Sequence, residues 1–154
     1  MKVIKVKNYE EMSKVAAEIF KDVVKNKPNA VLGLATGTTP LGLYSELIKD
    51  HKENGTTYKN IKTVNLDEYA GLDIESDQSY VYFMRHNLFE GLDIDLKNTN
   101  IENGKAEDKE KECERYNLSS INFTGYEIKE FYKKIKNIDH DVSVSNMLIA
   151  LNTV

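Results

Sequence analysis

The sequence predicts an α/β fold in which helices pack on the faces of a parallel sheet. Short apolar runs alternate along the chain with longer segments whose apolar residues recur at helical spacing. This order of strand and helix favours parallel strands joined by crossover helices. We expect one domain, because 154 residues can enclose one sizeable core but not comfortably two.

The first elements follow in order from the N-terminus. Residues 2–6 alternate apolar and charged side chains, which predicts a strand. Asn8, with Glu11 three residues later, predicts a capped helix start, and apolar residues at helical spacing continue this helix to Lys27–Pro28. Residues 30–35 are apolar throughout, which predicts a strand covered on both faces.

Two more units repeat this pattern. Pro40 is expected as the first residue of the next helix, and residues 61–66 as the next strand. A helix near residues 80–88 follows, with an aromatic stripe assigned to the core. The apolar residues of the two helices are Leu41, Leu43, Tyr44, Leu47 and Ile48 for the first, and Tyr80, Phe83, Met84 and Leu88 for the second.

The last third of the chain is more charged. Residues 105–112 predict a solvent-facing helix, and Cys113 is expected to be an ordinary thiol on a helix. Thr124 and Glu127 form a second capping box, which predicts another helix. Residues 142–151 are a candidate for a last strand.

Composition limits the partners of the chain. The net charge is −4 with both signs mixed, which argues against a nucleic-acid partner, since phosphate backbones attract a basic surplus. No apolar stretch approaches the ~20 residues of a membrane-spanning helix, and the N-terminus lacks a signal-peptide pattern. A single cysteine allows no intrachain disulfide, which is compatible with a reducing cytoplasm.

The loop Thr36–Gly37–Thr38–Thr39 is the first candidate for a binding site. It lies between a buried strand and a helix start, where backbone N–H groups and the helix dipole favour an anion such as phosphate. It matches neither a Walker loop nor the dinucleotide-binding pattern. The alternative is an ordinary strand-to-helix turn capped by hydroxyl groups.

Asp67 and Glu68 end the strand at 61–66 and are the second candidate. In parallel sheets, ligands bind outside the carboxyl ends of the strands, so this stretch and the loop at 36–39 can face a common crevice. A carboxylate here can be a general base, a helix-cap acceptor or a loop charge, and spacing alone favours a structural role. His140 lies between two aspartates, but solvent exposure is favoured over metal ligation there.

Several ordered stretches resemble the glucosamine-6-phosphate deaminase family. They are residues 31–48 (VLGLATGTTPLGLYSELI), 63–72 (TVNLDEYAGL) and 78–94 (QSYVYFMRHNLFEGLDI), continued by Asn103–Gly104 and 112–116. The resemblance covers about residues 1–117 and leaves 118–154 as a divergent tail of the same domain. It implies a Rossmann-like three-layer fold of the sugar-phosphate isomerase and deaminase type, incomplete at the C-terminus.

The resemblance also implies a reaction. Deaminases of this family convert glucosamine 6-phosphate and water to fructose 6-phosphate and ammonia, without a metal or organic cofactor. Asp67 corresponds to the base that moves a proton between the amine-bearing carbon and the aldehyde carbon. Thr36, Gly37, Thr38 and Thr39 correspond to the loop that holds the sugar phosphate, and Glu68 is placed with the substrate-binding residues.

Residues 118–154 depart from the family pattern. They contain neither the Gly-His nor the Asn-Glu-Pro motif of the family, and Gly125 is their only glycine. We therefore assign no function to His140 or Asp141. We therefore expect little or no deaminase activity from this chain. The alternatives are a sugar-phosphate binder without turnover, a fragment without independent function, or a hydrolase resembling the 6-phosphogluconolactonases. An open sheet edge would also favour a homo-oligomer.

Overall fold

A computed structural model describes residues 4–120, and in them three short strands form one parallel sheet. The strands are β1 (Val31–Gly33), β2 (Lys62–Val64) and β3 (Thr99–Asn100), in the order β1-β2-β3. Leu32 pairs with Thr63, and Thr63 with Thr99. The predicted parallel α/β class is therefore confirmed.

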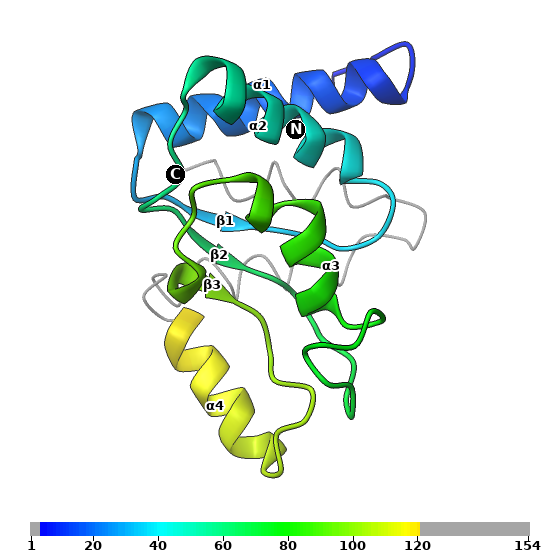
Figure 1. Cartoon of the computed structure of the whole chain (residues 1–154), viewed down its shortest axis with the longest axis vertical. Helices are drawn as coiled ribbons and strands as arrows, with labels where there is room; N and C mark the ends of the chain where they lie inside the picture. The colour runs from blue at the N-terminus through cyan, green and yellow to red at the C-terminus, as the bar shows by residue number, and fades with distance from the viewer. Residues whose placement is uncertain (1–3, 121–154) are drawn as a thin grey trace.

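Between residues 4 and 120, four α-helices and two short 3-10 helices surround this sheet (Figure 1). Helix α2 connects β1 to β2 and α3 connects β2 to β3, while α1 lies alongside α2 and α4 occupies the opposite end of the molecule. Their bounds are α1 (Tyr9–Asn26), α2 (Leu41–Asn54), α3 (Tyr80–Asn87), η1 (Phe89–Gly91), η2 (Leu96–Asn98) and α4 (Lys109–Ser120).

Helix α1 begins as its capping pattern predicts. The Asn8 side chain accepts a hydrogen bond from the Glu11 amide at 2.9 Å. The Glu11 carboxylate accepts from the Lys7 amide at 2.7 Å, one residue before the position that a standard capping box uses. The helix ends at Asn26, immediately before Lys27–Pro28, as expected.

The core lies between the sheet and helices α1, α2 and α3. Leu32 of β1 and Leu34, directly after this strand, belong to the core. Thr63 of β2 pairs with Leu32 and lies on the same face of the sheet, because side chains alternate along a strand. The predicted apolar faces of α2 and α3 contribute to it. Buried residues from the helices include Ala17, Phe20, Val24, Leu43, Tyr44, Leu47, Met84 and Leu88.

Several predictions of elements are wrong or shifted. Residues 4–6 are not in a strand, and Ile4 is 43% exposed, because no strand pairs with this segment in the described part of the chain. Helix α4 begins at Lys109 instead of 105, since Asp108 accepts a hydrogen bond from the Lys111 amide and so ends the preceding turn. Pro40 is the N-cap of α2 and not its first residue. Strand β3 was not predicted, because two polar residues carry no strand pattern.

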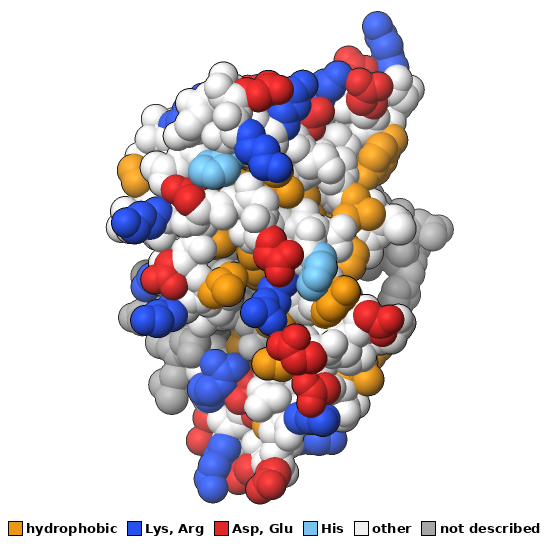
Figure 2. Space-filling model, viewed as in Figure 1, with side chains coloured by type: hydrophobic (Ala, Val, Ile, Leu, Met, Phe, Trp, Pro, Cys, Tyr) orange, Lys and Arg blue, Asp and Glu red, His pale blue; other side chains and the backbone are white. Residues whose placement is uncertain are grey.

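Other predictions lie outside the described residues. These are residues 2–3 of the first strand, the helix after Thr124, the strand at 142–151 and the surroundings of His140. Within the described residues, no helix is long and apolar enough to cross a membrane. On the face shown in Figure 2, positive and negative side chains are interspersed over the surface.

Candidate functional site

Two tyrosine hydroxyl groups fix the loop that follows β1. Tyr44 of α2 donates to the Ala35 carbonyl oxygen at 2.6 Å and accepts from the Ala35 amide at 3.1 Å. Tyr9 of α1 donates to the carbonyl oxygens of Thr38 and Thr39, at 3.0 and 3.1 Å, and its single proton is shared between them. The loop is therefore held at its start and at its end.

The N-terminus of α2 presents backbone donors to this loop. Gly37 has a φ of +91°, a conformation that favours glycine. Among residues 4–120, no hydrogen bond uses the amide N–H groups of Gly37, Thr38 or Thr39, and Pro40 provides no side-chain cap. Unpaired N–H groups at the positive end of a helix dipole are the physical requirement for binding an anion.

Asp67 lies on the loop that leaves the carboxyl end of β2. Partial desolvation, and then the negative charge of Glu68, raise its pKa above the usual range of an aspartate. The side chain remains exposed, so water limits the size of this effect. A carboxylate with a raised pKa is better suited to accepting a proton near neutral pH than an ordinary surface aspartate.

Glu68 uses both carboxylate oxygens in hydrogen bonds to the backbone. Oε1 accepts from the amides of Tyr69 and Tyr80, at 2.8 and 3.0 Å, and Oε2 accepts from the Val81 amide at 3.0 Å. Two of these donors are in the first turn of α3. That Glu68 contacts a substrate stays a prediction, and its observed partners belong to the protein itself.

Tyr80 brings the two predicted stretches together. Its hydroxyl is close enough to the side chains of Tyr69, Asp67 and Thr36 for each of them to affect its pKa. The hydrogen bond with Tyr69, together with burial and the charge of Asp67, raises the pKa of Tyr80 to about 12. The phenol therefore lies near both the loop after β1 and the loop after β2, and it stays protonated at neutral pH.

The assignment of Tyr80 to the core was wrong. Met84 and Leu88 are buried as predicted, but Tyr80 is half-buried and packs on the exposed Tyr69 in a tilted arrangement, with ring centroids 4.7 Å apart. Ser79 caps α3, so Tyr80 is the first residue of this helix and lies at the sheet edge from which the loops emerge. The Ser79 cap is the sequence signal that would have placed Tyr80 at the site.

The loop after β3 closes against the Asp67–Tyr69 turn. The Gly71 amide donates to the Gly104 carbonyl oxygen at 2.7 Å. A Cβ at Gly104 would overlap the Tyr69 carbonyl oxygen and lie 3.4 Å from Glu68 Cγ. Glycine at this position therefore permits the close approach of the two loops.

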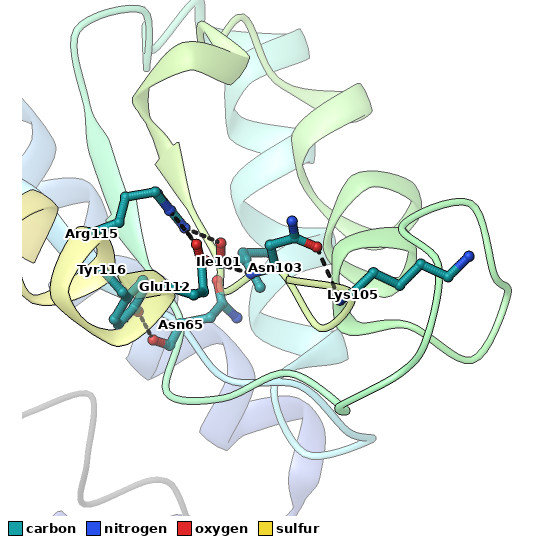
Figure 3. A network of polar contacts seen from close by, with 7 residues as sticks. All are labelled: Asn65, Ile101, Asn103, Lys105, Glu112, Arg115 and Tyr116. Carbon is teal, nitrogen blue, oxygen red and sulfur yellow. Dashed lines mark hydrogen bonds and ion pairs between the residues drawn. The ribbon is translucent and has the colours of Figure 1, made fainter. Parts of the chain in front are cut away.

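Helix α4 ties these loops to the end of β2 (Figure 3). Glu112 accepts a hydrogen bond from the Asn103 amide at 2.7 Å and is paired with Arg115. The Tyr116 hydroxyl donates to the Asn65 carbonyl oxygen, two residues before Asp67. Helix α4 thus contacts both the segment after β2 and the loop after β3.

Unpaired polar atoms are buried beside Asp67. Asn65 is 3% exposed, and in residues 4–120 neither atom of its side-chain amide has a hydrogen-bond partner. Oε2 of Glu102 is also buried without a partner. Burial raises the pKa of Glu102, and the charges of Asp67, Glu112 and Glu68 raise it further. Acidic groups therefore gather at this edge of the sheet, in a partly desolvated setting.

The histidines of the described chain do not belong to this site. The Nδ1 atom of His51 lies 2.7 Å from the Thr56 carbonyl oxygen, and His86 stacks on Tyr82 with centroids 3.8 Å apart. No group of three or more potential metal ligands occurs between residues 4 and 120. Cys113 is exposed on α4, as expected.

Curated relatives carry a consistent name. The chain is 54% identical over 116 residues to a glucosamine-6-phosphate deaminase of Geobacillus sp. (strain WCH70), a match covering 75% of this chain and 46% of that protein. It is 50% identical over 129 residues to the enzyme of the same name from Clostridium beijerinckii, covering 84% and 53%. The chain thus spans about half the length of the curated relatives it matches. No protein-family model matches it.

Solved structures agree with these relatives. A monomeric glucosamine-6-phosphate deaminase matches with a TM-score of 0.77 and 46% identity, over 79% of this chain and 51% of that one. A 6-phosphogluconolactonase from Thermotoga maritima matches with a TM-score of 0.61 and 21% identity, over 78% and 53%. The second match shows a shared fold alone, so a lactonase activity is not favoured. Sequence and structure together make this chain a homologue of the N-terminal part of the glucosamine-6-phosphate deaminases.

Proposed function

We propose that this chain serves the deamination of glucosamine 6-phosphate, which consumes water and yields fructose 6-phosphate and ammonia, at a rate well below that typical of an enzyme. The observation that carries the proposal is the meeting of Thr36, Asp67 and Tyr80 at one edge of the sheet. These residues lie on stretches that resemble the deaminase family, and relatives with that name share about half of the aligned residues.

Asp67 is the proposed base. After the sugar ring opens, its carboxylate takes the proton from the amine-bearing carbon and returns it to the aldehyde carbon, and water then hydrolyses the imine. The raised pKa of Asp67 supports this role, because proton transfer is most efficient when the pKa of the base lies near the working pH.

The loop Thr36–Thr39 is the proposed contact for the phosphate group. Its unpaired amides, the φ of Gly37 and the uncapped start of α2 support this role. We expect no metal or organic cofactor, in keeping with the family resemblance. A cytoplasmic location and the absence of nucleic-acid or membrane partners belong to the same proposal, and a homo-oligomer is compatible with it.

A second candidate is sugar-phosphate binding without turnover. The observation that favours it is the lack of a Gly-His sequence in residues 118–154. The binding loop and Asp67 would then be retained without the groups that assist ring opening. The division of the domain at residue 117 stays a prediction, since the described residues end at 120.

One experiment separates these functions. Ammonia release from the purified chain with glucosamine 6-phosphate is measured beside the ligand-induced shift in melting temperature. Turnover that falls by about 10²-fold or more in Asp67→Asn supports the deaminase. A thermal shift without turnover supports the binder. The thermal shift is also measured with inorganic phosphate as a second ligand. If the chain shows neither turnover nor a thermal shift with either ligand, both proposed functions are contradicted.

A further inference from the structure

We propose that Glu68 is a positioning residue: its carboxylate joins the loop after β2 to the first turn of α3 and thereby sets Asp67 against Tyr80. This inference rests on the proposed function, in which Asp67 is the base. It gives Glu68 a role through its neighbours instead of through direct contact with a substrate.

The hydrogen bonds of Glu68 define this connection. Its oxygens accept from the adjacent Tyr69 amide and, 12 and 13 residues along the chain, from the amides of Tyr80 and Val81. Hydrogen bonds from backbone amides to an ionised carboxylate are stronger than neutral ones, and negative charge is favoured at a helix N-terminus. The Glu68 side chain therefore connects the start of the segment between β2 and α3 to its end.

Glu68 acts on Tyr80 directly, because it holds the backbone amide of the residue whose phenol belongs to the site. The Tyr80 ring packs on Tyr69, and its hydroxyl lies near the side chains of Thr36 and Asp67. Glu68 thus accepts hydrogen bonds from the backbone amides of both tyrosines in this aromatic pair. A shift of the first turn of α3 would separate the Tyr80 hydroxyl from Thr36 and from Asp67 together.

The loop after β3 packs against the same turn. Gly104 lies so close to Tyr69 that a Cβ would overlap the Tyr69 carbonyl oxygen, and the Gly104 carbonyl accepts from the Gly71 amide at 2.7 Å. The turn is therefore confined between α3 and the loop after β3. Glu68 is the residue in this turn whose side chain accepts hydrogen bonds from the backbone of α3.

Glu68 also has an electrostatic effect on Asp67. Its negative charge raises the pKa of Asp67, in addition to the effect of desolvation. Glu102 and Tyr80 also lie near Asp67, whose charge raises the pKa of both. Removing the charge of Glu68 should therefore lower the pKa of Asp67 without deleting any group that touches a substrate.

The test uses the full chain with Glu68→Gln, and Glu53→Gln on the exposed surface of α2 as the matched control. The carboxyl carbon of Asp67 is titrated by NMR, contacts between the rings of Tyr69 and Tyr80 are followed by NOE, and melting temperatures are recorded with and without glucosamine 6-phosphate. In Glu68→Gln we expect a lower Asp67 pKa, weaker ring contacts and a melting temperature reduced by roughly 2–6 °C. The control should match the unmodified chain.

The variant Glu68→Asp separates the effect of the negative charge from the effect of side-chain length. It also provides a second measurement if the glutamine variant does not fold. It keeps the negative charge but is one methylene shorter, so the Asp67 pKa should remain raised while the ring contacts and melting temperature fall. An unchanged melting temperature and unchanged ring contacts in Glu68→Asp, or an unchanged Asp67 pKa in Glu68→Gln, would overturn the proposal.

Direct substrate contact by Glu68 predicts a different pattern. The glutamine variant would then keep the Asp67 pKa, the ring contacts and the melting temperature, and lose only the stabilisation by glucosamine 6-phosphate; that result also overturns the proposal. If the unmodified chain shows no such stabilisation, the proposed function fails. The titration and the ring contacts still decide the role of Glu68, because neither needs a ligand.

Discussion

At the scale of single residues, the raised pKa of Asp67 has a consequence for stability that is opposite to that of most aspartates. The folded chain holds the Asp67 proton more tightly than the unfolded chain, so the stabilising contribution is present at low pH and is lost as the pH rises through the folded-state pKa. We expect Asp67→Asn to unfold at the same or a higher temperature than the unmodified chain at pH 7. Below the ordinary carboxyl pKa, the difference should vanish. Thermal unfolding across this pH range measures it, and a variant that is clearly less stable at pH 7 would contradict the assigned direction.

Gly37 allows the backbone requirement of the loop to be separated from its binding role. A Cβ at Gly37 meets no atom within 4 Å, so the cost of Gly37→Ala comes from its φ of +91° alone, about 1–2 kcal/mol in the free energy of unfolding. Gly55, the C-cap of α2, has a φ of +70° and equally open surroundings, which makes Gly55→Ala a matched control. Chemical denaturation should show similar losses for both variants. Only Gly37→Ala should also weaken stabilisation by glucosamine 6-phosphate, and an equal effect of both on the ligand shift would count against the loop as its contact.

At the scale of elements, the caps of two helices differ in burial. Ser79 is 1% exposed, accepts from the Tyr82 amide at 3.0 Å and donates to the Ile74 carbonyl oxygen at 3.1 Å, whereas Asn8 caps α1 in an exposed position. We expect Ser79→Ala to cost about 1–2 kcal/mol in the free energy of unfolding and Asn8→Ala about 0.5–1 kcal/mol. Urea denaturation measures both. The reverse order would mean that solvent replaces the Ser79 hydroxyl at the start of α3.

At the scale of the whole molecule, buried tyrosines limit stability at high pH. Burial raises the pKa of Tyr44, and it also raises the pKa of Tyr58, where the charges of Asp50 and Asp93 add to the effect. Above about pH 10 these phenols ionise in the unfolded chain while the folded chain keeps them protonated, so the free energy of unfolding falls by about 1.4 kcal/mol per pH unit for each. Denaturation at pH 9 to 11 tests this, with Tyr58→Phe expected to have a shallower slope. Equal slopes in the variant and the unmodified chain would contradict it.

The class of the fold and the stretches of the candidate site could be predicted from local signals in the sequence. Helical spacing and the capping pattern at Asn8 are local signals, and they placed α1, α2 and α3 within a few residues of their observed bounds. The apolar runs that became β1 and β2 are local signals as well. Asp67 and the loop at 36–39 could be named for the same reason, since each follows directly from a strand end or a helix start.

The way in which these stretches meet depends on contacts between distant parts of the chain. Strand β3 is two polar residues that form a strand because β2 offers hydrogen-bonding partners, and residues 4–6 form none because no strand among residues 4–120 pairs with them. The contact of Tyr80 with Thr36, and the hydrogen bonds of Glu68 to α3, join residues that are far apart in the chain. Periodicity and capping act over a few residues, whereas such contacts depend on how the crossover helices bring distant loops to one edge of the sheet. The residue types were therefore readable in the sequence, and their partners were fixed by packing.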